Sequence, residues 1–221
     1  MNKIKSYVFN AYGALLDTYL PFEKYRDELG ENALVIYKLW RSKRLQYSSQ
    51  LSLMNQYTSY EKIRKYALDF ACAVYGVESE DIKNQILKAH SELTCYPDVQ
   101  EVLTTLKQAG MQTAVLSNGS PQKLNSTLRH AGINELLDGV YSTEQVRSYK
   151  PSPSVYEFVG EQLGLPRNKI CFVSSNSWDI AGAVACGFHT AWINRYNRTP
   201  EHLPYKADHE IKDLSEILSL E

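Results

Sequence analysis

The chain has 221 residues, enough for one large domain or for a core with an inserted segment. Its 24 basic and 25 acidic residues give a formal net charge of −1, which offers no electrostatic case for binding nucleic acid or an anionic membrane surface. No apolar stretch approaches the ~18 residues of a membrane-spanning helix, and the N-terminus lacks the long apolar region of a signal peptide.

The first predicted element is a strand over residues 5–10, an apolar run that ends in the polar Asn10 and precedes Gly13. This pattern is typical of a buried parallel strand that stops at the carboxyl edge of a sheet, where open α/β sheets bind ligands. Many hydrolases carry an attacking aspartate at this position. Here the side chain is an amide.

Residues 15–91 are continuously helix-like and contain little glycine. The pattern predicts a helix end at Gly30, and helices over 32–48 with Asn32 as a cap, over 57–75 closed by Gly76, and from Ser79 onwards. Because this block directly follows the first strand, we expect a lid-like insertion beside the carboxyl edge of the sheet.

From residue 96 onwards, helices alternate with strands. The predicted helices cover 99–109, a segment from Pro121, 153–163, 177–186 and, last, 211–218. The predicted strands cover 112–116, 139–142, 170–173 and, as the final strand, 190–193. This alternation predicts an α/β fold with a parallel sheet covered on both faces.

Four polar clusters directly follow predicted strands: Asn10, Ser117-Asn118, Lys150 and residues 174–179. Each alone is typical of a cap or turn, but the ends of parallel strands converge, so we expect one shared site. Displacement at carbon or phosphorus needs a nucleophile, a cation and hydrogen-bond donors. Lys150 is the candidate cation, and Ser117 and Asn118 are the candidate donors. Asp179 either contributes to the site or only starts a helix.

The four cysteines show no CxxC pairing and lie in apolar contexts: Cys72, Cys95, Cys171 and Cys186. We interpret them as reduced core residues of a cytoplasmic protein rather than as metal ligands or disulfide partners.

Five stretches together resemble the (S)-2-haloacid dehalogenases of the haloacid dehalogenase superfamily: YVFNAYGALLD (7–17), LWRSKRLQYSSQLSLM (39–54), AVLSNG (114–119), SYKPSPSVYE (148–157) and FVSSNSWDIAGAVACGFHTAWINR (172–195). The resemblance implies a Rossmann-like core of residues 1–14 and 95–221 and a helical cap of residues 15–94. It also implies a homodimer, no metal ion and no cofactor. In that family an aspartate at position 10 attacks C2 of a short 2-haloacid, and water hydrolyses the resulting ester with inversion.

The resemblance also assigns roles to residues of this sequence. Arg41 would bind substrate or departing halide from the cap, although a solvated place in the basic run 41–44 is the alternative. Ser117 and Asn118 would hold the substrate carboxylate, and Lys150 would neutralise the nucleophile. The remaining site residues would place water and shape the site (Tyr156, Ser174, Asn176 and Asp179) or line the pocket (Tyr12, Leu45, Tyr60 and Trp178).

The first motif departs from the family pattern twice, because Asn10 replaces the nucleophilic aspartate and Ala14 replaces the usual threonine. An amide oxygen is a much weaker nucleophile than a carboxylate. The superfamily's phosphatases carry a second, magnesium-binding carboxylate two residues after the first, where this chain has Tyr12. We therefore expect no phosphatase activity and no metal ion.

Three hypotheses follow from the sequence. The first is a 2-haloacid dehalogenase-type hydrolase, inactive or strongly impaired because of Asn10, that still binds small 2-substituted carboxylates. The second is a non-catalytic descendant that acts as a small-carboxylate-binding or scaffold protein. The third is a divergent hydrolase with another nucleophile, for which Ser117 lacks an evident base.

Overall fold

A six-stranded sheet forms the centre of the protein in this computed structural model, which describes residues 4–220. The strand order is β3-β2-β1-β4-β5-β6, and every neighbouring pair is parallel. The strands are β1 (Ser6–Phe9), β2 (Gln112–Ser117), β3 (Gly139–Ser142), β4 (Ile170–Ser174), β5 (His189–Ile193) and β6 (His209–Ile211). The order reverses between β1 and β4, and such a switch point is where open parallel sheets bind ligands.

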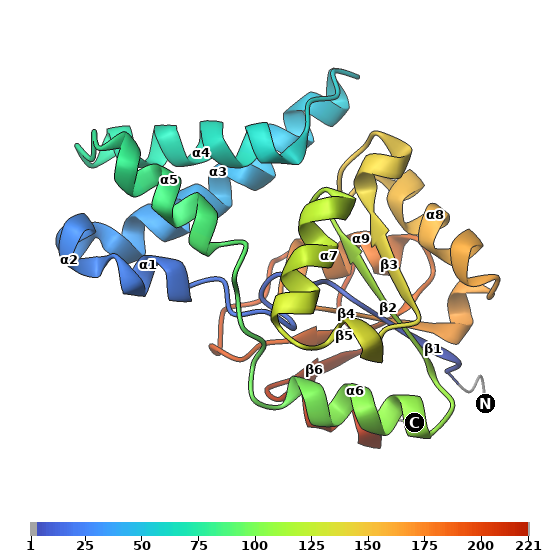
Figure 1. Ribbon diagram of the computed structural model, residues 1–221. Helices are drawn as coiled ribbons and strands as arrows, with labels where there is room; N and C mark the ends of the chain where they lie inside the picture. Colours follow the sequence, from blue (N-terminus) through green and yellow to red (C-terminus); the bar gives the residue numbers. More distant parts are fainter. Residues whose placement is uncertain (1–3, 221) are drawn as a thin grey trace.

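Helices cover both faces of the sheet (Figure 1). Alternate residues of each strand point to opposite faces, so apolar side chains are buried on both faces. Tyr7 and Phe9 pack towards one layer, which comprises α6 (Val99–Gln108), α7 (Pro121–His130) and the 3-10 helix η5 (Leu214–Ser219). Val8 packs towards the other layer, which comprises α8 (Pro153–Leu163) and α9 (Ser177–Ala185). The predicted α/β architecture is therefore confirmed.

The chain between β1 and β2 forms a separate group of helices beside the sheet, which we call the helical segment (residues 20–89) (Figure 1). It comprises α1 (Leu20–Lys24), α2 (Arg26–Leu29), η1 (Gly30–Asn32), α3 (Ala33–Leu53), α4 (Tyr60–Val74) and α5 (Glu80–Ala89). Its own apolar core is built around Phe22, Trp40 and Leu68. The helix end at Gly30 is observed, and the Ser79 hydroxyl caps α5 by accepting from the Ile82 N–H.

Leu15, Leu16 and Leu93 pack with the core of the sheet, so both connections of the helical segment lie against that layer. The division into a core and a cap at residues 14/15 and 94/95 stays a prediction. Residues 1–3 and 221 of the predicted core lie outside the described residues.

Three predictions of secondary structure are wrong. Helix α3 continues to Leu53 instead of ending near residue 48, since no glycine or proline interrupts residues 48–53. The last strand is β6 rather than residues 190–193, and residues 211–218 do not form an α-helix. Ile211, Leu214 and Ile217 are buried at three-residue spacing, which suits the tighter 3-10 turn of η5 as well as an α-helix. Short 3-10 turns also occur at η2 (Asn134–Leu136), η3 (Thr143–Val146) and η4 (Arg167–Lys169).

The four cysteines are unpaired thiols, of which Cys72 and Cys171 are buried and the other two are partly exposed. Burial raises the pKa of Cys72 to about 11 and that of Cys171 to about 12, so both thiols stay protonated at neutral pH. Within residues 4–220, no helix has the length and apolar character needed to cross a membrane.

Candidate active site

The predicted polar clusters meet at the carboxyl edge of the sheet. Asn10 follows β1, Ser117 and Asn118 lie at the end of β2, and Asn176 follows β4. Together with Lys150 they line a pocket of about 700 Å³, whose other wall is the helical segment. The pocket lies at the switch point between β1 and β4, as expected for this topology.

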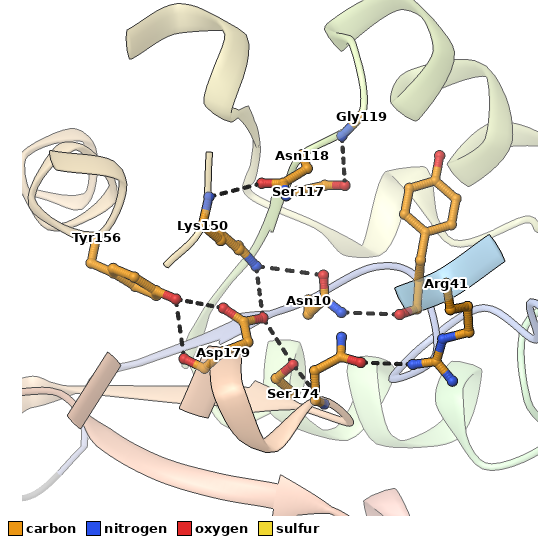
Figure 2. Close-up of polar contacts among 11 residues, drawn as sticks. Asn10, Arg41, Ser117, Asn118, Gly119, Lys150, Tyr156, Ser174 and Asp179 are labelled. Atoms are coloured by element: carbon orange, nitrogen blue, oxygen red, sulfur yellow. Dashed lines mark hydrogen bonds and ion pairs between the residues drawn. The ribbon is translucent and has the colours of Figure 1, made fainter. Parts of the chain in front are cut away.

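The two ends of the Asn10 side chain have chemically different neighbours. Its Nδ2 donates to the backbone oxygen of Tyr12 at 3.0 Å, and its Oδ1 accepts from Lys150 Nζ at 3.4 Å. The Asn10 backbone N–H donates to the Val173 oxygen at 2.8 Å. The two side-chain contacts, drawn in Figure 2, hold an amide with its nitrogen towards an acceptor and its oxygen towards a cation.

Lys150 is a buried cation paired with one carboxylate. Its Nζ lies 3.1 Å from Asp179 Oδ2, and the two side chains are 2% and 0% exposed. Burial lowers the pKa of the Lys150 ammonium, and the Asp179 carboxylate opposes that decrease. The ammonium also lies 4.7 Å from the centre of the Phe172 ring, which favours the charged form.

Asp179 is fixed by two further donors on the side away from the pocket. Ser174 Oγ donates to its Oδ2 at 2.9 Å, and the Tyr156 hydroxyl donates to its Oδ1 at 2.7 Å (Figure 2). Burial, and secondarily the Asp179 charge, raises the pKa of Tyr156, which keeps the phenol a neutral donor. Tyr156, Ser174 and Asp179 lie behind Lys150 and are not among the residues that line the pocket.

Arg41 links the helical segment to the sheet. Its Nη2 donates to Asn176 Oδ1 at 2.7 Å (Figure 2). Its guanidinium lies over the Tyr37 ring, 5.6 Å from the ring centre. Arg41 lines the pocket, so it is not merely a solvated member of the basic run 41–44.

Ser117 and Asn118 are held by the backbone around them. Ser117 Oγ accepts from the Gly119 N–H at 3.2 Å, and Asn118 Oδ1 accepts from the Lys150 backbone N–H at 3.2 Å (Figure 2). These bonds occupy acceptor positions, so the Ser117 hydroxyl proton and the Asn118 amide protons are the groups left to donate to a ligand. An anionic group fits such a pair of donors.

All four residues predicted to line the pocket do so: Tyr12, Leu45, Tyr60 and Trp178. The sequence interpretation missed other wall residues, notably Arg44 and Arg198. Arg44 lies three residues after Arg41, so helical spacing puts both on one face of α3. Arg198 lies in the polar loop after β5, and a loop at the carboxyl end of a parallel strand is itself a signal for a site.

Within the described part of the chain, no three or more histidine, cysteine, aspartate or glutamate side chains are grouped so that they could hold a metal ion.

Comparisons with known proteins define the class of this protein. Residues 11–187 match the haloacid dehalogenase-like hydrolase family, and the chain belongs to that family. It is 41% identical to (S)-2-haloacid dehalogenase 1 of Pseudomonas sp. (strain CBS-3) over 221 residues, which span 100% of this chain and 97% of that protein. It is 38% identical to (S)-2-haloacid dehalogenase 4A of Burkholderia cepacia, over 100% of this chain and 96% of that protein.

Solved structures agree with this placement. A dehalogenase crystallised with an intermediate complex superposes with a TM-score of 0.96 at 37% identity, over 99% of this chain and 97% of that chain. The L-2-haloacid dehalogenase of Xanthobacter autotrophicus superposes with a TM-score of 0.90 at 29% identity, over 98% of both chains. The predicted fold and family are thereby confirmed.

Proposed function

We propose that this chain is an (S)-2-haloacid dehalogenase-type hydrolase in which Asn10 occupies the position of the nucleophile. It binds short 2-substituted carboxylates and turns them over slowly or not at all. The observation that carries the proposal is the contact between Lys150 Nζ and Asn10 Oδ1 at 3.4 Å, at the end of β1 and inside the pocket. A group in that place is directed at a bound ligand and is next to a cation that would stabilise a carboxylate.

The residues around Asn10 suit displacement of halide at C2. Ser117 and Asn118 donate to the substrate carboxylate, and Arg41 faces the departing halide. Lys150 donates to the Asn10 amide oxygen, at the place where it would neutralise a carboxylate, and Asp179 positions Lys150.

The remaining site residues support this arrangement from around the reacting groups. Ser174 and Tyr156 hold Asp179, and Asn176 links Arg41 to the edge of the sheet. The apolar wall limits the access of water to the reacting atoms and consists of Tyr12, Leu45, Tyr60 and Trp178.

An amide limits this chemistry at its first step. The Asn10 amide carries no net negative charge, so the attack of its oxygen on C2 is much weaker than that of a carboxylate. If it displaced halide, the product would be an imidate, and water would open it to an aspartyl ester with loss of ammonia. That sequence is slow because of its first step, and it occurs only once for each Asn10, because hydrolysis of the ester leaves an aspartate at position 10 in place of the amide.

We further propose that residues 15–94 act as a cap, that no metal ion or cofactor takes part, and that the protein is a cytoplasmic homodimer. Tyr12 stands where the superfamily's phosphatases have a metal-binding carboxylate, and its ring stacks on His90 at 5.4 Å. Tyr66, Phe70 and Val74 are exposed at four-residue spacing on α4, an apolar stripe that suits a second copy of the chain.

A non-catalytic role in binding a small carboxylate, or as a scaffold, is the second candidate. The observation that favours it is the double change in the first motif, because Ala14 is fully buried and offers no hydroxyl near position 10. Chloride release by an Asn10→Asp variant separates the two candidates. Release supports the hydrolase-type site, and its absence supports the binding protein.

Isothermal titration with (S)-lactate, a 2-hydroxyacid that cannot lose halide, tests binding. We expect saturable binding that Ser117→Ala weakens, because that variant removes a donor to the carboxylate. The absence of affinity for lactate and for short 2-haloacids would refute the proposal.

A further inference from the structure

Arg44 is a buried cation for which the structure shows no anionic partner. Its side chain projects from α3 into the wall of the pocket and is only 8% exposed. Among the residues that the structure describes, no carboxylate lies within 4 Å of it, and its Nε has no hydrogen-bond partner. The guanidinium lies over the Trp40 ring at 4.0 Å, which stabilises the charge but satisfies none of its N–H groups. A buried charge without a counter-ion is costly, so the site is built for an anion.

The groups around Arg44 further disfavour its unpaired positive charge. Burial lowers the pKa of Arg44, the Tyr60 hydroxyl opposes this, and the charges of Arg64 and Arg41 lower it further. Glu61, in the first turn of α4, is paired with Arg64 at 2.8 Å. Helix α3 therefore presents positive charge that the protein itself leaves uncompensated.

The lining of the whole pocket also has an excess of positive charge. Its described lining includes one carboxylate, Glu201, against five cationic side chains: Lys38, Arg41, Arg44, Lys150 and Arg198. Lys150 is balanced by Asp179, but Arg41 bonds to a neutral amide. The carboxylate of a simple monoacid, bound at Ser117 and Asn118, would leave this charge unmatched. The volume of about 700 Å³ also lies within the range of about 300–1,000 Å³ that is typical of pockets for larger ligands.

We propose that Arg44 binds a second anionic group of the ligand, so that the pocket takes a 2-substituted dicarboxylate in preference to a monocarboxylate. This inference rests on the proposed function, in which Ser117 and Asn118 hold the first carboxylate. A planar guanidinium with free N–H groups matches a carboxylate in two parallel hydrogen bonds, which gives both affinity and orientation. Arg44 then determines specificity without touching the reacting atoms.

The position of Arg44 along α3 fits this role. Arg41 reaches the sheet edge through Asn176, and Arg44 lies three residues further on the same face, about 4.5 Å along the helix axis. The second carboxylate would therefore lie about one helical turn from the Arg41–Asn176 contact. Four- and five-carbon dicarboxylates are ligands of that size class.

Isothermal titration of the unmodified 221-residue chain tests the assignment, with (S)-lactate, (S)-malate and (S)-2-hydroxyglutarate at constant ionic strength. We expect one of the two dicarboxylates to bind about 10-fold or more tightly than lactate. Arg44→Gln should remove that advantage. Arg44→Lys, which keeps the charge in nearly the same volume but loses the planar fork, should retain part of it.

Lys43→Gln is the matched control, since it removes one positive charge from the adjacent residue of α3. Lys43 does not line the pocket, and its Nζ donates to Gln46 at 2.8 Å. This variant should keep the full preference for the dicarboxylate, with circular dichroism confirming that all variants are folded.

Equal affinities for mono- and dicarboxylates, no binding of either, or a preference that survives Arg44→Gln would each overturn the inference. Chloride that competes with lactate only when Arg44 is present would assign a halide ion to this position and would also overturn it. The proposed function fails separately, if Asn10→Asp releases no halide from 2-haloacids, because that readout does not depend on a second carboxylate.

Discussion

Replacing Asp179 with asparagine should strongly destabilise the protein. Asp179 is the one carboxylate within 4 Å of Lys150 among the described residues, and the two side chains are 0% and 2% exposed. The variant keeps the size of the side chain and can still accept from Ser174 or Tyr156, so it mainly removes charge. Breaking a buried ion pair on one side costs about 3–5 kcal/mol, and we expect a loss in the lower part of that range.

The size of this loss should depend on pH in a defined direction. Burial already lowers the pKa of Lys150, and removing the carboxylate lowers it further. In the variant, Lys150 therefore tends to lose a proton and become neutral on folding. The free-energy cost of that deprotonation falls as the pH rises. The deficit in the free energy of unfolding should be largest near neutral pH and smaller at alkaline pH.

Urea unfolding followed by circular dichroism measures this deficit. Asp69→Asn is the matched control, because its partner Lys65 lies at 3.0 Å on the surface, with side chains 35% and 47% exposed. That control should cost less than about 1 kcal/mol. The double variant Lys150→Met with Asp179→Asn should recover part of the loss, since no unpaired charge remains. A deficit for Asp179→Asn no larger than that for Asp69→Asn would refute the reasoning.

Two further predictions concern packing and alkaline stability. A Cβ at Gly182 would lie 2.6 Å from the Tyr156 hydroxyl, whereas a Cβ at Gly160 would have its nearest neighbouring atom at 3.7 Å. Gly182→Ala should therefore lower the free energy of unfolding, measured in urea, by about 1–3 kcal/mol. A neutral or stabilising result would contradict this. Gly160→Ala, also within a helix, should be neutral or stabilising by up to about 1 kcal/mol. Because the pKa values of Cys72 and Cys171 are raised in the folded protein, both thiols ionise at lower pH in the unfolded chain than in the folded one. The free energy of unfolding should therefore fall above pH 9, by about 1.4 kcal/mol per pH unit for each thiol. Replacing both with alanine should flatten that fall in urea titrations between about pH 8 and 11, and an unchanged slope would exclude this cause.

The order of strands and helices could be predicted because each strand of a doubly covered sheet is a short apolar run between helices. Asn10, Ser117 and Asn176 could be expected to meet, because parallel strands deliver the residues that follow them to the same edge. The end of the chain could not be predicted in the same way. Ile211, Leu214 and Ile217 are spaced so that their burial fits either a 3-10 turn or an α-helix.

How deeply each site residue is buried depends on the packing of side chains, which cannot be deduced from the pattern of residues along the sequence. Tyr156 was expected among the residues that bind substrate or shape the site, but it lies behind Lys150 and holds Asp179. Arg44 is in a run of charged residues that resembles a solvated face, yet Trp40 and the pocket wall enclose it. Helical spacing indicates which residues share a face, and only the packed structure shows what covers that face.

Chloride release from (S)-2-chloropropionate, measured side by side for the protein as written and for Asn10→Asp, tests the central claim most directly. Intact mass should be recorded in parallel to show that position 10 has not deamidated. We expect sustained release by Asn10→Asp, because the new carboxylate lies next to Lys150 in an otherwise complete pocket, and little or none by the protein as written. Sustained turnover by a protein that still carries Asn10, or no release by either form, would contradict the claim that the amide alone silences this site.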